Sequence, residues 1–228
     1  MADEHNRILK ILHEKIILKE EVFEKTQAVF NELKSYMSKL VHEIKSSVKD
    51  ISKSAPVNYA DTGKFEAQLT LADETLLVVM HTNIFTFDNN HEIWRNKYVQ
   101  QDNKRAFCGK IFIYNFLTDS FKYNRSSDVG YLLARIFVNR EGHFFIEGKK
   151  QLGYSYAEFA NNVFNPDSIA KVVESAIIYS LDFDPFTPPF EQISMLSVKE
   201  VQESELQSRV ATGRRLGFQF SSEGGDIN

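Results

Sequence analysis

Apolar positions in the first 50 residues recur with heptad spacing. When Leu9 is taken as position a, every later a position and three d positions are apolar. Neither Pro nor Gly occurs between Asp3 and Ser54, and Pro56 marks the end of the segment. The pattern predicts one long amphipathic, coiled-coil-like helix over residues 1–55. Its apolar positions are Leu9, Ile16, Phe23, Phe30, Met37, Ile44 and Ile51 at a, and Leu12, Leu33 and Leu40 at d.

This apolar stripe is wider and less regular than the seam of a two-stranded coiled coil. Polar Lys19, Thr26 and Ser47 occupy the remaining d positions, which favours packing against more than one neighbour. A helix of about 50 residues would be about 75 Å long, longer than the domain that follows it. We therefore expect part of the stripe to form an assembly interface with a second copy or another protein. The predicted interface comprises Leu9, Ile16, Phe23, Phe30, Leu33, Met37, Leu40, Ile44 and Ile51.

After Pro56 the apolar period changes to two, which is typical of strands. Gly142 closes a four-residue turn in the clearest hairpin, residues 129–147. Short turns join neighbouring strands, so the sheet should be mainly antiparallel. The predicted strands are residues 64–71, 75–81, 83–87, 110–115, 120–123, 130–138 and 143–147.

The remaining segments predict helices. A short helix is expected within residues 88–107, and Asn165 is the expected N-cap of a helix over residues 166–179. Further helices are predicted at residues 155–163 and 197–211, followed by an apolar segment, residues 214–220, able to add as an edge strand. The sequence thus predicts an α+β fold. Its expected parts are residues 1–55 (assembly helix), 56–190 (α+β domain), 191–220 (C-terminal helix and apolar segment) and 221–228 (disordered tail).

The net charge and the length of the longest apolar run indicate which partners, nucleic acid or membrane, can be expected. The 27 basic and 31 acidic residues give a net charge of −4, so we do not expect a nucleic-acid partner. The longest apolar run, residues 76–80, is far shorter than the roughly 20 residues of a membrane span. The single Cys108 cannot form an intrachain disulfide, and the first residues lack a basic region followed by an apolar run. We expect a cytoplasmic protein without membrane contact.

Candidate chemistry is sparse. Asp88, His91, Glu92 and Arg95 are residue types suited to acid–base work, but they also suit an ordinary helix start. Cys108 is a candidate nucleophile, although a free cysteine is more often a small buried apolar residue. Asp88, His91, Glu92 and Cys108 are therefore catalytic candidates for which a structural role is favoured. No metal-ligand spacing and no glycine-rich phosphate loop occurs, so the sequence predicts neither metal nor cofactor.

The apolar stripe of the N-terminal helix is a stronger signal for assembly than the isolated candidate residues are for catalysis. We therefore expect a non-enzymatic interaction or regulatory protein that assembles through its N-terminal helix. Two alternatives stay open at this point. One is a small-molecule-sensing domain coupled to a partner, and the other is a hydrolase or nuclease that uses residues 88–95 or Cys108.

Overall fold

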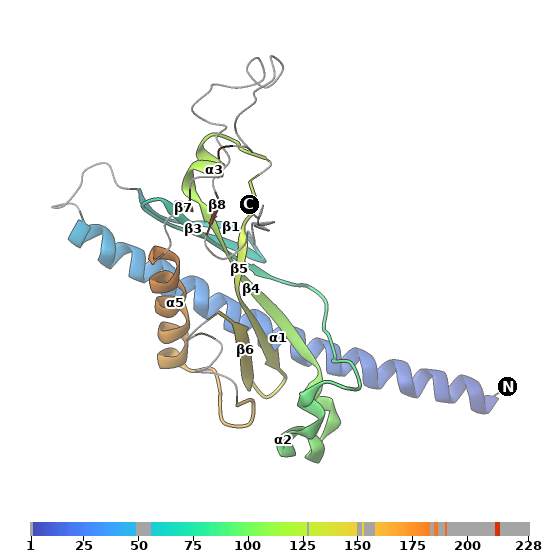
Figure 1. Ribbon diagram of the computed structural model, residues 1–228. Helices are drawn as coiled ribbons and strands as arrows, with labels where there is room; N and C mark the ends of the chain where they lie inside the picture. The colour runs from blue at the N-terminus through green and yellow to red at the C-terminus, as the bar shows by residue number, and fades with distance from the viewer. Residues whose placement is uncertain are drawn as a thin grey trace, which may run out of the picture.

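A long helix lies across one face of a six-stranded antiparallel sheet (Figure 1). The computed structural model describes residues 2–48, 56–126, 128–149, 152, 158–182, 185–186, 190 and 213–214. Together with a C-terminal helix, these elements make an α+β protein and confirm the predicted fold class. Coiled-coil pairing of the long helix stays a prediction.

The sheet is a meander in which each strand pairs with its neighbours in the chain. Its order is β1-β2-β3-β4-β5-β6, with every pair antiparallel. Gly142 in the β5–β6 turn has φ +80°, a left-handed conformation that favours glycine. The strands are β1 (Val57–Gly63), β2 (Glu66–Leu71), β3 (Glu74–Met80), β4 (Cys108–Leu117), β5 (Tyr131–Asn139) and β6 (Phe144–Gly148).

Two helices cover the same face of this sheet. Helix α1 (Ala2–Val48) contacts five of the strands, and α5 (Pro166–Leu181) packs against α1 and β3. Asn165 caps α5 through a reciprocal pair of hydrogen bonds with Ser168, as its position before Pro166 predicts. The main core lies between these helices and the sheet. It includes Phe30, Leu33, Met37, Leu69, Ile111, Ile136, Phe144 and Val172.

The long connection between β3 and β4 covers part of the opposite face. It contains η1 (Glu92–Arg95), α2 (Lys97–Gln101) and η2 (Asn103–Ala106), which agrees with the short helix expected there. A second apolar cluster anchors this connection on the sheet. Its buried members are Ile93, Val99, Ala106, Cys108, Phe137, Phe145 and Phe159.

Several predicted elements differ from the structure. Residues 120–123 were predicted as a strand, but they belong to α3 (Thr118–Lys122) and the turn after it, where Phe121 and Tyr123 are exposed. Residues 83–87 form only an isolated bridge, Phe85 to Cys108. The described part of the predicted helix 155–163 is a turn that ends in a bridge, His143 to Val163. The two strand corrections arise because aromatic residues in short segments resemble strands until chain packing is known.

Strand β1 was not predicted, although it is paired along most of its length with β2. At the other end of the chain, β7 (Pro185–Phe186) pairs with β8 (Gly213–Arg214). The predicted helix 197–211, the rest of the segment 214–220, the tail 221–228 and Ile51 lie outside the described residues.

Candidate functional site

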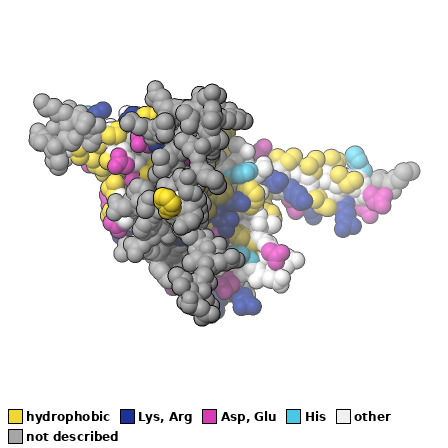
Figure 2. All heavy atoms as spheres, turned by 45° about the horizontal axis from the view of Figure 1, so that its top comes forward, with side chains coloured by type: hydrophobic (Ala, Val, Ile, Leu, Met, Phe, Trp, Pro, Cys, Tyr) yellow, Lys and Arg dark blue, Asp and Glu magenta, His cyan; other side chains and the backbone are white. Residues whose placement is uncertain are grey.

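The N-terminal part of α1 projects beyond the sheet (Figure 1). Every side chain from residue 3 to residue 17 is exposed, and Leu18 is the first buried one. This projecting segment is about 22 Å long at 1.5 Å per residue. It carries six large apolar side chains that are 41–61% exposed: Ile8, Leu9, Ile11, Leu12, Ile16 and Ile17. Figure 2 shows hydrophobic side chains along it, interspersed with charged ones.

The predicted interface residues therefore fall into two groups. Phe30, Leu33 and Met37 are buried in the chain's own core, where another molecule cannot reach them. Phe23, Leu40 and Ile44 are partly buried against the same core. Leu9 and Ile16 lie on the exposed projecting segment. Among the described members of that set, these two are the ones accessible to a partner.

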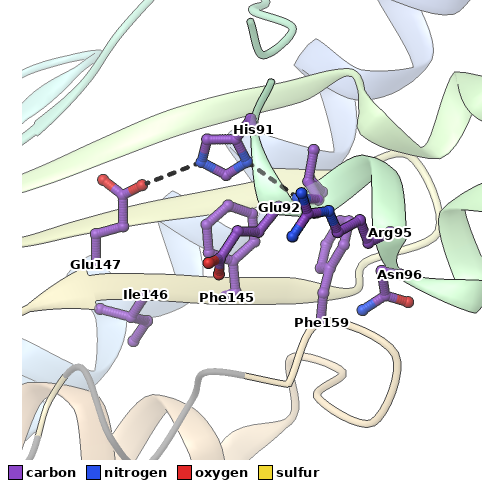
Figure 3. A pocket seen from close by; sticks show the side chains of 9 residues that line it. His91, Glu92, Arg95, Asn96, Phe145, Ile146, Glu147 and Phe159 are labelled. Atoms are coloured by element: carbon purple, nitrogen blue, oxygen red, sulfur yellow. Dashed lines mark hydrogen bonds and ion pairs between the residues drawn. The ribbon is translucent and has the colours of Figure 1, made fainter. Parts of the chain in front are cut away.

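A separate pocket lies where η1 meets the edge strand β6. Its volume is about 540 Å³, within the roughly 300–1,000 Å³ typical of ligand pockets. Aromatic rings form its floor, while η1 and Glu147 of β6 supply polar side chains (Figure 3). The described lining residues are His91, Glu92, Ile93, Arg95, Asn96, Phe145, Ile146, Glu147 and Phe159.

His91 is held between η1 and β6. Its Nδ1 accepts the backbone N–H of Ile93 at 3.2 Å, so a neutral imidazole carries its proton on Nε2. That Nε2 lies 3.9 Å from Oε1 of Glu147, and Figure 3 shows both contacts. Oε2 of Glu147 accepts from Arg135, with Nε at 2.8 Å. The histidine thus caps η1 and faces a carboxylate whose charge Arg135 balances.

The η1 side chains beside His91 make fewer polar contacts within the described residues. Glu92 and Arg95 are three residues apart in a 3₁₀-helix, where residues i and i+3 share a face. Within the described residues, neither makes a hydrogen bond or ion pair. Asn96 uses Oδ1 to accept from the N–H of Tyr98 at 3.0 Å, which leaves its Nδ2 as a donor. Figure 3 shows Glu92, Arg95 and Asn96 around the space above Phe145 and Phe159.

The other two catalytic candidates, Asp88 and Cys108, have roles in the fold instead. Asp88 starts the turn before η1: its Oδ1 accepts from the N–H of Asn90 at 3.0 Å, and its carbonyl accepts from Trp94 Nε1 at 2.9 Å. Cys108 is fully buried at the start of β4, and burial raises the pKa of its thiol well above the ordinary value. The structure therefore places Asp88 and Cys108 away from the pocket lining, whereas His91 and Glu92 are part of it.

A polar network fixes α2 and η2 on the β5–β6 turn. Tyr98 Oη donates to Glu141 Oε2 at 2.7 Å and accepts from Asn139 Nδ2 at 2.9 Å, while Arg105 Nε donates to Glu141 Oε1 at 2.9 Å. Burial, together with its bond to Glu141, raises the pKa of Tyr98. Burial acts to raise the pKa of Glu141, but the hydrogen bonds from Arg105 and Tyr98 lower it overall.

A second link connects this region to α1. Arg140 on the β5–β6 turn donates from one terminal nitrogen to Asp102 Oδ2 at 2.6 Å. Its other terminal nitrogen lies 3.4 Å from Glu21 Oε2 on α1. Since Asp102 also caps η2, the connection that carries the pocket is tied to the long helix just after its projecting segment.

Sequence reasoning identified the η1 side of the pocket and missed the rest. Phe145, Glu147 and Phe159 come from β6 and the segment after it, far along the chain from His91. The alternation in residues 143–147 places Phe145 and Glu147 on one face of the strand. It carries no signal that this face meets η1.

Among the residues that the structure describes, no group of three or more His, Cys, Asp or Glu side chains is placed to hold a metal ion. The described part of the chain also contains no helix that is both long and apolar enough to cross a membrane. Comparisons with protein-family models, with curated proteins and with solved structures found no match.

Proposed function

We propose that this chain is a non-enzymatic interaction protein that assembles with a second copy of itself through the projecting segment of α1, residues 3–17. The observation that supports the proposal is the row of exposed apolar residues there: Ile8, Leu9, Ile11, Leu12, Ile16 and Ile17. Contiguous exposed apolar patches of this kind mark interaction surfaces in soluble proteins.

The stability of the segment argues for a partner. Most of the stability of a helix in a protein comes from packing an apolar face. The side chains of residues 3–17 are all exposed, so the sheet does not supply that packing. Burying the apolar row against another molecule would supply it, at roughly 25 cal/mol for each Å² of apolar surface removed from water.

A second copy is the occupant that fits best. Each copy presents the same row, and a self-complementary patch forms a closed two-fold dimer, the commonest symmetric assembly. Residues 3–21 carry four basic and five acidic side chains. Two copies of this nearly neutral segment can approach without the repulsion that a strongly charged helix would cause.

The test is the mass in solution, measured by light scattering after size-exclusion chromatography. Wild-type protein should have the mass of a dimer or larger oligomer. A variant with Leu9→Gln, Leu12→Gln and Ile16→Gln should have the mass of one chain, because the apolar row is interrupted by residues that keep helix propensity.

The matched control carries Arg7→Gln, Lys10→Gln and Glu14→Gln on the opposite side of the same helix, and it should retain the wild-type mass. Near-ultraviolet circular dichroism should be alike in all three proteins, since the substituted side chains lie outside the core. A wild-type mass of one chain at tens of micromolar concentration would overturn the proposal. Equal masses for the two variants would overturn it too.

A further inference from the structure

The pocket between η1 and β6 combines opposite charges with an aromatic floor. We infer that it binds a small zwitterion, an α-amino acid with an aromatic side chain, whose ammonium and carboxylate groups bridge Glu92 and Arg95. This inference is independent of assembly through α1, and it gives a ligand class to a pocket whose residues have no assigned role.

Two lining residues, Glu147 and His91, already interact with other residues of the chain. Glu147 accepts from Arg135 through Oε2, and its Oε1 faces His91 Nε2 at 3.9 Å. His91 Nδ1 is occupied by the N–H of Ile93. These residues are therefore balanced in charge, but Glu147 Oε1 and His91 Nε2 lie too far apart for a hydrogen bond, so both atoms are still available to a ligand.

The other available groups belong to η1 and its C-cap, next to His91. The Glu92 carboxylate, the Arg95 guanidinium and Nδ2 of Asn96 have no hydrogen-bond or ion-pair partner within the described residues, and all three belong to the pocket lining. The Glu92 carboxylate is an anionic acceptor, the Arg95 guanidinium is a cationic donor, and the Asn96 amide nitrogen is a neutral donor. Their charges sum to zero, so a ligand with a single net charge would satisfy one of the two ions and leave the other unpaired.

The geometry of η1 sets the spacing of the two charges. Residues three apart eclipse in a 3₁₀-helix, so Glu92 and Arg95 project from the same side of η1. Their charged groups nevertheless do not form an ion pair, and Figure 3 shows the Glu92 carboxylate over Phe145 and the Arg95 side chain above Phe159. An α-amino acid presents its ammonium and carboxylate on one carbon, which allows the two ions to be bridged at once. Asn96 Nδ2 adds a second donor for the carboxylate.

The aromatic floor of the pocket favours a ligand with an aromatic side chain. Phe145 is nearly buried, and its ring stands at 74° to that of Phe159 with centroids 5.2 Å apart. Phe137, the cross-strand partner of Phe145, stacks beside it with centroids 4.6 Å apart. A ligand ring placed over Phe145 would extend this aromatic cluster, and offset or edge contacts between rings contribute beyond the area they bury.

The experiment uses isothermal titration calorimetry of the full chain with three probes. L-Phenylalanine carries both charges, 3-phenylpropionate lacks the ammonium group, and 2-phenylethylamine lacks the carboxylate. L-Phenylalanine should bind about tenfold or more tightly than either analogue, the expected loss for one hydrogen-bonded ion pair.

Two variants assign each contact. In Glu92→Gln, L-phenylalanine and 3-phenylpropionate should bind with nearly equal affinity, because the ammonium partner is removed. In Arg95→Gln, L-phenylalanine and 2-phenylethylamine should become nearly equal. Both side chains are exposed, so these substitutions leave the core intact. Glu32→Gln on α1 and Lys97→Gln on α2 are the charge-matched controls, and they should bind all probes as wild type does.

Three results would overturn the inference. One is the absence of heat from L-phenylalanine at millimolar concentration. Another is equal binding of the three probes by the wild-type chain. The third is an equal effect of Glu92→Gln or Arg95→Gln on all probes, which would mean that the two residues act on each other instead of on the ligand.

Discussion

Thr26 on α1 lies directly over Gly109 on β4, so closely that a Cβ added to Gly109 would be 2.1 Å from the Thr26 hydroxyl oxygen. The hydroxyl donates to the carbonyl of Val22 at 2.7 Å and is fully buried. This polar residue in the apolar stripe is therefore satisfied within its own helix. The glycine opposite allows α1 to approach the sheet closely.

Gly109→Ala should lower the free energy of unfolding by about 1–3 kcal/mol, the usual cost of overpacking a core. Combined with Thr26→Ala, the loss should be smaller than the sum of the two single losses, because part of the clashing side chain is gone. Urea unfolding of the four proteins measures this coupling. Strictly additive losses would show that the two residues are not in contact.

Tyr98→Phe should destabilise the fold by about 1–2 kcal/mol. The substitution removes one hydroxyl that serves both Glu141 and Asn139, and the loss of a hydrogen bond by the fully buried Asn139 amide is costly. Tyr123→Phe, at an exposed site, is the control and should stay within about 0.5 kcal/mol of wild type. Equal thermal midpoints for Tyr98→Phe and wild type would contradict the role given to the network.

Glu141 should make stability depend on pH in the acidic range. Its folded pKa lies below the ordinary value of 4.5, so its charged form stabilises the fold above that pH, and the contribution is lost as pH falls through the folded pKa. Glu141→Gln should cost about 1 kcal/mol at neutral pH, as for a partly exposed pair. The difference from wild type should shrink on acidification below pH 4.5. Denaturant unfolding across this range measures it, and a difference that grows in acid would refute the assignment.

Cys108 should be inert in the native protein. It is fully buried and burial raises the pKa of its thiol, while thiol reagents require an accessible thiolate. Labelling with a chromogenic disulfide reagent should be negligible in buffer and should reach one thiol per chain in denaturant. Complete labelling of the folded chain within seconds would mean that the start of β4 opens readily.

Most of the fold follows from local pattern. The uninterrupted helical period before Pro56 predicts α1, and the alternation around the turn at Gly142 predicts β5 and β6. Strand β1 escapes this reasoning because residues 58–63 are polar or small apart from Tyr59. It is a strand because β2 pairs with it at the edge of the sheet, and pairing of this kind is a tertiary effect.

The contribution of β6 to the pocket could not be predicted from the sequence. His91 and Glu92 stand out as residue types, but their roles depend on β6, which is brought to them by the packing of Ile93 and Phe145 in one apolar cluster. Likewise, the heptad pattern marks Phe30 and Leu9 as equivalent. The position of the sheet makes one a core residue and leaves the other exposed.

The meander order of the sheet has a consequence for synthesis on the ribosome. Because each strand pairs with the strand before it, the sheet can extend one hairpin at a time as the chain emerges, and such sequential contacts favour rapid folding. Helix α1 is made before the sheet, yet its core side chains contact strands and a helix that are made later. The part of its apolar stripe that packs on β4, β5 and α5 therefore stays uncovered until these elements have left the exit tunnel, so the nascent chain presents a natural binding site for a chaperone during that interval.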